Sequence, residues 1–161
     1  MKNGENDERG IKYSGGHFFS LSGVYYVDLT GDGKKEAIIF LYKLSCGGSC
    51  DGGSTIIYIY KSSKGKAKML DKIDTGSKSV SCSLKSFKVQ DKKIILEQFG
   101  KCATNTIYQE NTLRFCKFCI KVMTRSIYSF RSLELLKESS EEFETPEINV
   151  MSYLFEVSIN D

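Results

Sequence analysis

The sequence predicts an all-β fold of antiparallel hairpins, arranged as two sheets or as a partial-propeller-like meander. Short β-branched and aromatic runs, such as residues 37–42 and 55–60, recur along the chain. They are too short for core helices and are bounded by Gly and Ser. Residues 120–130 alternate in polarity with a period of two, as a half-buried strand does. Hairpins joined in series give antiparallel sheets.

Length and composition indicate one folded domain. The chain has 161 residues, 40% hydrophobic and 12% aromatic, which is typical of a globular protein. Residues 1–10 are polar, so we expect a flexible N-terminal segment followed by a single β domain over 11–161.

The elements follow in order. Runs 37–42 and 55–60 predict central strands, and a hairpin turn is expected at 63–66. Further strands are expected at 69–73, 84–89, 94–99, 120–130 and 133–136. The sequence also favours one short helix near 139–143, a break at 144–147 and a last edge strand within 150–159.

The run Asp28-Leu29-Thr30-Gly31-Asp32-Gly33-Lys34-Lys35-Glu36 lies between two apolar segments. It places oxygen-bearing side chains at alternate positions of a glycine-bent loop, as calcium-binding loops do. The predicted ligands are the side chains of Asp28, Thr30, Asp32 and Glu36, and the carbonyl of Lys34. The alternative is a polar hairpin loop without a metal, because Asp, Gly and Thr are common turn residues.

An EF-hand is excluded, because its twelfth position is Ile39 here instead of a carboxylate, and the flanks are strand-like. Over residues 25–40 the chain resembles the calcium loop of FG-GAP (VCBS-like) repeats of integrin-type β-propellers, D-x-[DN]-x-D-G-x-x-D. Thr30 and Glu36 depart from that pattern. The resemblance implies calcium-dependent rigidity and a role in adhesion or protein recognition.

Cysteine usage indicates an oxidising compartment, because disulfides persist there. The six cysteines are Cys46, Cys50, Cys82, Cys102, Cys116 and Cys119. Cys46 and Cys50 are spaced for a local disulfide, and Cys82 and Cys102 are candidates for a further pair.

Two other interpretations of the cysteines stay open. Cys46, Cys50, Cys116 and Cys119 have the spacing of a four-sulfur zinc site. Buried or free thiols are the other. A redox role for the C-x-x-C pair is disfavoured, because that motif usually begins a helix and this segment reads as β.

Catalysis and nucleic-acid binding find little support in the sequence. His17 is the single histidine, and no nucleotide-binding or nucleophile-elbow motif occurs. The net charge of +3 arises from 23 basic residues interspersed with 20 acidic ones, without a basic stripe. No apolar run is long enough to span a membrane, and the chain begins without the apolar region of a secretory signal.

The sequence therefore predicts a non-catalytic, calcium-binding β module of an exported or cell-envelope protein. We expect it to be a periplasmic or extracellular domain, such as that of a bacterial lipoprotein whose signal or lipid anchor lies outside this chain. Its expected partner is a protein or cell-surface ligand. The alternative is a protein–protein interaction module stabilised by zinc at the four-cysteine site.

Overall fold

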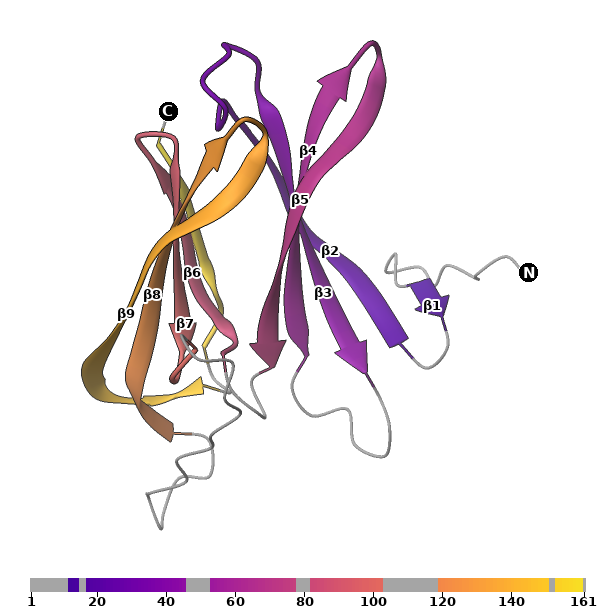
Figure 1. Ribbon diagram of the computed structural model, residues 1–161. Coiled ribbons are helices and arrows are strands. Elements are labelled where there is room, and N and C mark those ends of the chain that lie inside the picture. Colours follow the sequence, from indigo (N-terminus) through magenta and orange to yellow (C-terminus); the bar gives the residue numbers. More distant parts are fainter. Residues whose placement is uncertain are drawn as a thin grey trace.

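The computed structural model describes residues 12–14, 17–45, 53–77, 82–102, 119–150 and 153–160. Figure 1 shows two twisted sheets that face each other. Sheet A has the strand order β1-β2-β3-β4-β5, and sheet B has the order β10-β6-β7-β8-β9. The described part of the chain contains no α-helix. The all-β prediction is confirmed in its two-sheet form.

Sheet A is an antiparallel meander. Its strands are β1 (Lys12–Ser14), β2 (His17–Val27), β3 (Glu36–Ser45), β4 (Ser54–Ser63) and β5 (Lys66–Ser77). Every neighbouring pair is antiparallel. Strands β3 and β4 contain the runs 37–42 and 55–60 and lie inside the sheet, as predicted.

Sheet B contains a second meander and one returning strand. Its strands are β6 (Leu84–Gln90), β7 (Lys93–Phe99), β8 (Cys119–Arg131), β9 (Glu134–Asn149) and β10 (Glu156–Ile159). The pairs from β6 to β9 are antiparallel, whereas β10 pairs in parallel with β6 at the edge. The expected last edge strand is therefore present, but it makes a parallel pair.

Three hairpins close with two-residue turns. In Lys64-Gly65, Asp91-Lys92 and Ser132-Leu133 both residues have positive φ. Two consecutive positive φ values are characteristic of the type I′ turn, whose twist matches that of the flanking strands. These turns fix the registers β4–β5, β6–β7 and β8–β9.

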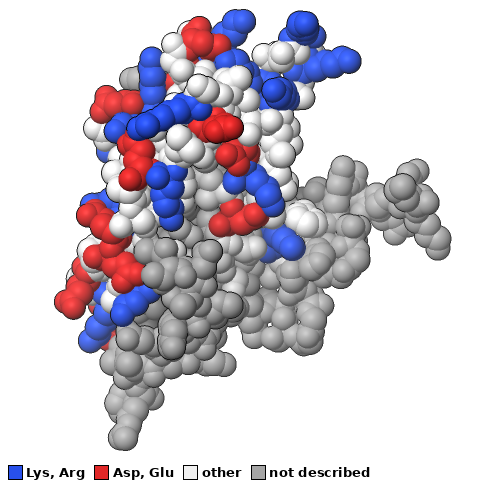
Figure 2. All heavy atoms as spheres, viewed as in Figure 1, with Lys and Arg blue, Asp and Glu red and all other residues white. Residues whose placement is uncertain are grey.

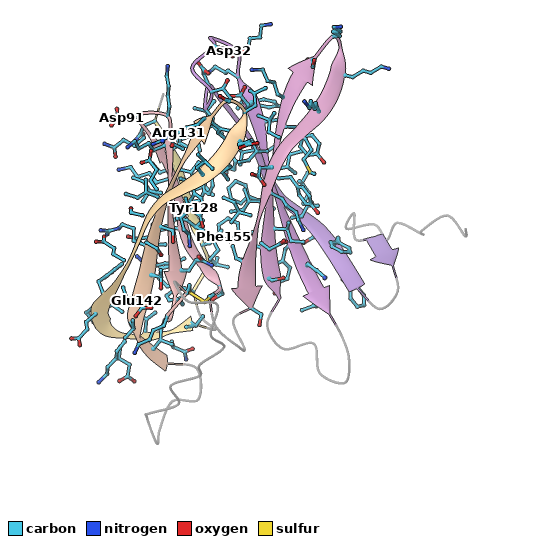
Figure 3. All side chains as sticks on the ribbon, viewed as in Figure 1. Asp32, Asp91, Tyr128, Arg131, Glu142 and Phe155 are labelled. Atoms are coloured by element: carbon cyan, nitrogen blue, oxygen red, sulfur yellow. A yellow bond between two sulfur atoms is a disulfide. The ribbon has the colours of Figure 1, made fainter. Side chains whose placement is uncertain are left out.

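The main core lies between the two sheets, and a smaller buried cluster of Phe99, Met123 and Val150 lies on the other side of sheet B. Sheet A contributes Ile38, Phe40, Ile57 and Ile59, which alternate with outward-facing neighbours along β3 and β4. Sheet B meets them with residues such as Phe87, and the Phe40 and Phe87 rings are 5.0 Å apart, edge to face. Figure 3 shows Tyr128 and Phe155 reaching into the same space between the sheets.

The predicted helix at 139–143 and the break at 144–147 are both wrong. Strand β9 runs without interruption through both segments and pairs with β8. Cross-strand contacts override the helix propensity of the glutamates: Ser140 hydrogen bonds to Ser126 at 3.0 Å, and Glu141 pairs with Arg125. Pro146 is tolerated because β9 is an edge strand and its register shifts there, between Ile120 and Val122 of β8.

Candidate functional site: a loop closed around a lysine ammonium

The predicted cation loop connects β2 to β3 at the end of the molecule that carries the hairpin turns. Figure 3 shows Asp32 in this loop, with Asp91 in the β6–β7 turn and Arg131 at the end of β8 lying at the same end of the molecule. The pair Val27 and Glu36 closes the loop at its base. Gly31 and Gly33 have φ values of 77° and 79°, a backbone conformation that glycine adopts readily in a tight loop. Gly31 also lies against Lys92 of the β6–β7 turn, so both sheets contribute to this end.

Asp28 organises the first half of the loop through backbone amides. Its Oδ1 accepts a hydrogen bond from the Gly31 amide at 2.7 Å, and its Oδ2 accepts one from the Gly33 amide at 3.0 Å. Both carboxylate oxygens therefore bind protein donors, as an aspartate does in an Asx-type turn.

Glu36 is the buried anchor of the loop. It is fully buried, and its Oε2 accepts hydrogen bonds from the amides of Leu29 at 2.8 Å and Thr30 at 3.2 Å. The Thr30 hydroxyl donates to Glu36 Oε1 at 3.2 Å. A buried carboxylate with several donors is well satisfied, and the contacts hold both ends of the loop together.

Lys61 supplies the positive charge of the loop. It follows Ile57 and Ile59 on the inner face of β4, and its Nζ reaches the loop from the neighbouring strand. The ammonium lies 2.5 Å from Asp32 Oδ2, 3.4 Å from Thr30 Oγ1 and 3.6 Å from Glu36 Oε1. Three of the four predicted ligand side chains thus converge on one cation, and this cation belongs to the protein.

The pKa values of the pair reflect this contact. The hydrogen bond from Lys61, together with one from the Lys34 amide at 3.0 Å, lowers the pKa of Asp32 below its ordinary value of 3.8. The hydrogen bond to Asp32 raises the pKa of Lys61 above 10.5. Both groups are therefore charged at neutral pH. Lys34 contributes its amide to this network, beside the role that the sequence predicts for its carbonyl.

In this arrangement the donor set suits an ammonium better than calcium. Calcium takes six to eight oxygens at about 2.3–2.6 Å, whereas an ammonium has three N–H groups and donates to three oxygen acceptors. Both oxygens of Asp28 bind amides, and Lys61 holds Asp32. Within the described ranges no group of three His, Cys, Asp or Glu side chains is placed to hold a metal ion. Calcium binding at these residues stays a prediction, and it requires Lys61 to move away.

Sequence reasoning missed Lys61, although the chain carries a signal for it. Residues 57, 59 and 61 share one face of a strand by their alternation. A lysine that extends a buried row needs an anionic partner, and the loop between β2 and β3 offers three carboxylates.

The structure describes one of the cysteine pairs considered above. Cys82 and Cys102 form a disulfide with their Cα atoms 5.6 Å apart, which joins the segment just before β6 to the segment after β7. Cys46, Cys50 and Cys116 lie outside the described residues, as does the side chain of Cys119. The four-cysteine zinc alternative therefore stays untested.

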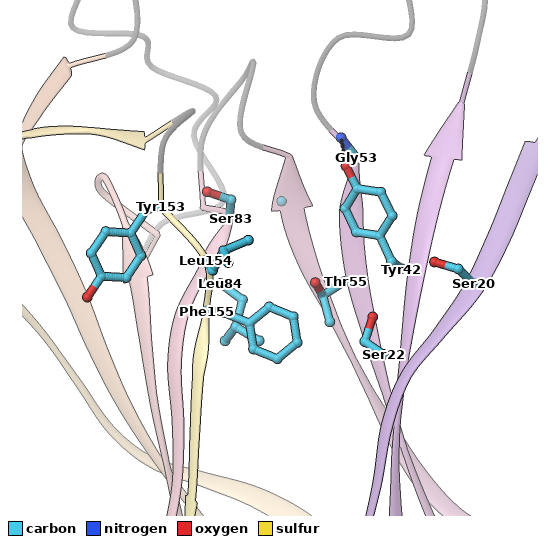
Figure 4. A pocket seen from close by; sticks show the side chains of 11 residues that line it. Ser20, Ser22, Tyr42, Gly53, Thr55, Ser83, Leu84, Tyr153, Leu154 and Phe155 are labelled. Carbon is cyan, nitrogen blue, oxygen red and sulfur yellow. Dashed lines mark hydrogen bonds between the residues drawn. The ribbon is translucent and has the colours of Figure 1, made fainter. Parts of the chain in front are cut away.

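A pocket of about 340 Å³ opens between the sheets at the end opposite the loop (Figure 4). The Tyr42 hydroxyl accepts a hydrogen bond from the Gly53 amide at 2.9 Å, and Thr55 is held by Thr75. Its described lining is formed by hydroxyl and apolar groups, without Asp, Glu, Lys, Arg or His. These residues offer hydrogen bonds to a ligand and no carboxylate or imidazole for general acid–base chemistry.

Fold and loop together define the class: a two-sheet β protein with an acidic loop that encloses a cation. Searches of protein families, curated proteins and solved structures found no match to this chain. The resemblance to FG-GAP calcium loops therefore stays a prediction from residues 25–40.

None of the described segments is an apolar helix long enough to cross a membrane. On the face seen in Figure 2, basic and acidic side chains are interspersed over the described surface.

Proposed function

We propose that this chain is a non-catalytic binding module of an exported or cell-envelope protein, with one end made rigid by a cation in the loop between β2 and β3. The observation that carries this proposal is the convergence of Thr30, Asp32 and Glu36 on the Lys61 ammonium. A loop fixed in this way holds its exposed tip in one conformation, which favours recognition of a protein or cell-surface ligand. The Cys82–Cys102 disulfide supports export, since disulfides persist in oxidising compartments.

We propose Lys61 as the resident cation and calcium as the second candidate. Calcium is favoured by the spacing of the loop and by the three ligand side chains that already surround one positive charge. The two cations exclude each other, because an ammonium within 4 Å of a divalent ion is strongly repelled.

Thermal melts of the wild type and of Lys61→Met, each with calcium, magnesium or chelator, separate the candidates. We expect Lys61→Met to melt below the wild type in chelator, and to regain stability with millimolar calcium by mass action. The wild type should respond less, because its ammonium already holds the ligands. Lys93→Met is the matched control, since Lys93 is in an exposed ion pair with Glu138 outside the loop.

Each outcome has a distinct meaning. A large calcium-selective rise of the wild-type melting temperature, with none for Lys61→Met, would contradict Lys61 as the resident cation. Equal melting temperatures of Lys61→Met and Lys93→Met in chelator would show that the Lys61 ammonium does not stabilise the loop. If neither protein responds to calcium, the calcium prediction is wrong.

A further inference from the structure

The outer face of sheet A is apolar, although it faces away from the core. On β2, β3 and β4 the side chains between the buried ones point outward and form rows across the sheet. This face, called here the outer face of sheet A, includes Leu21, Val24, Tyr26, Ile39, Tyr58 and Tyr60. Leu21 is 61% exposed and Tyr26 is 62% exposed. An antiparallel sheet with one solvated face normally carries polar residues there.

The outer face of sheet B shows that normal pattern around Glu97 and Arg125, whereas Phe99 and Met123 on the same side are buried in a small cluster with Val150 and Tyr153. On this face Glu97 bridges Lys85 at 3.1 Å and Arg125 at 2.8 Å, and Arg125 continues to Glu141 at 3.1 Å. The two sheets therefore share a core but differ in their outer faces. A contiguous exposed apolar patch of this kind is typical of an interaction surface.

The charge on this face favours a second copy over a charged partner. Lys72 and Asp74 of β5 share the face with Tyr58 and Ile56, and they neutralise each other at 2.8 Å. Lys43, two residues beyond Leu41 on β3, adds one positive charge at the margin of the face. A nearly neutral face does not repel a copy of itself. The described side chains of this face also include no cluster of Lys and Arg of the kind that attracts an anionic membrane surface or an acidic partner.

The size of the face indicates a weak, reversible contact. Four strands at about 4.8 Å spacing and six residues at about 3.3 Å rise give a footprint of about 20 by 20 Å. Two copies would bury roughly 800 Å², which is less than the roughly 1,200–2,000 Å² of stable interfaces and falls in the range of weak, transient contacts. Two sheets packed face to face interdigitate such side chains at about 10 Å separation.

We propose that the outer face of sheet A is a self-association surface, on which two copies pack sheet against sheet as a symmetric dimer. The contact is isologous, so each interface residue occurs twice in it. This proposal is independent of the cation in the loop between β2 and β3, which lies at the end of the sandwich.

Sedimentation equilibrium of the full chain over about 1–500 µM tests the proposal, because this range covers micromolar dissociation constants. We expect a monomer–dimer equilibrium for the wild type. Leu21→Lys and Tyr26→Lys should each raise the dissociation constant by about 30-fold or more, because each places two charges in the apolar contact. Leu154→Lys is the matched control: Leu154 is 84% exposed and lies outside this face, so this variant should dimerise like the wild type.

Three results would overturn the proposal. One is a wild type that stays monomeric over the whole concentration range. Binding of that monomer to vesicles of mixed neutral and anionic phospholipid would assign the face to a membrane surface and would equally overturn the proposal. Another is a dimer that persists in the sheet A variants. The last is a dimer lost equally in Leu154→Lys. Circular dichroism identifies the variants that fold. Because Leu21→Lys and Tyr26→Lys probe the face independently, the test can still be made if one of the two variants fails to fold.

Discussion

Glu36 is the residue on which the loop depends most. It is fully buried and accepts two backbone amides and the Thr30 hydroxyl, while Lys61 neutralises its charge from 3.6 Å. Asp28 and Asp32 are more exposed, and they accept hydrogen bonds from backbone amides that are closer along the chain, those of Gly31 and Lys34. The acidic residues of the loop therefore differ in role, although the sequence presents them as equivalent ligands.

Glu36→Ala should lower the free energy of unfolding by about 2–3 kcal/mol, because it leaves the buried amide of Leu29 without its acceptor. Glu36→Gln keeps one acceptor oxygen and should cost less. Denaturant unfolding measures both, with the exposed Glu147→Ala as a control expected to change stability by less than about 0.5 kcal/mol. Equal effects of Glu36→Ala and Glu147→Ala would show that the buried carboxylate is dispensable.

At the scale of elements, local sequence patterns predicted most strands. Strand β9 and the position of Lys61 depend instead on contacts between residues that are distant in the sequence. The runs 37–42, 55–60 and 84–99 were readable because alternation and turn residues are local signals. Strand β9 was not predictable over 139–147, because its glutamates favour a helix, and the strand is set by β8, where Arg125 pairs with Glu141 and Ser126 bonds to Ser140. The loop was found from its spacing, whereas Lys61, which is 29 residues from Asp32, comes from another strand.

The ion pairs on the outer face of sheet B predict a pH dependence. Burial raises the pKa of Glu97, but hydrogen bonds from Arg125 and Lys85 outweigh it and bring the pKa below its ordinary value of 4.5. A carboxylate with a lowered pKa stabilises the fold above its ordinary pKa, and this contribution is lost as pH falls through the lowered value. Glu97→Gln should therefore cost about 1 kcal/mol at pH 7, and the difference from wild type should shrink below pH 4.5.

Urea unfolding of both proteins over this pH range is the measurement. Glu134→Gln, an exposed glutamate of β9, serves as the control. A difference between Glu97→Gln and wild type that grows as the pH falls would contradict the direction of the pKa shift.

At the scale of the whole molecule, the two sheets are held together by one interlayer core. Phe40 and Phe87 meet edge to face at its centre, and both are fully buried. The two meanders have similar antiparallel orders, and β10 returns from the end of the chain to pair with β6. Packing between the meanders makes one cooperative unit out of hairpins that are marginal alone.

Phe87→Ala should lower the free energy of unfolding by about 4 kcal/mol, since it removes a fully buried ring and leaves a cavity between the sheets. Leu154→Ala, at a side chain that is 84% exposed, should change it by less than about 0.5 kcal/mol. Denaturant unfolding followed by circular dichroism compares them. Two separate transitions in the wild type would show that the sheets unfold independently and would contradict a shared core.

The Lys61 ammonium contacts Thr30, Asp32 and Glu36 as the cation of the loop between β2 and β3. The most direct measurement is an NMR titration of the Asp32 carboxyl in the wild type and in Lys61→Met, in the presence of a chelator. Because Lys61 is the largest cause of the lowered pKa, Asp32 should titrate below 3.8 in the wild type and move toward 3.8 in Lys61→Met. An Asp32 that titrates at the same pH in both proteins would contradict this role of Lys61.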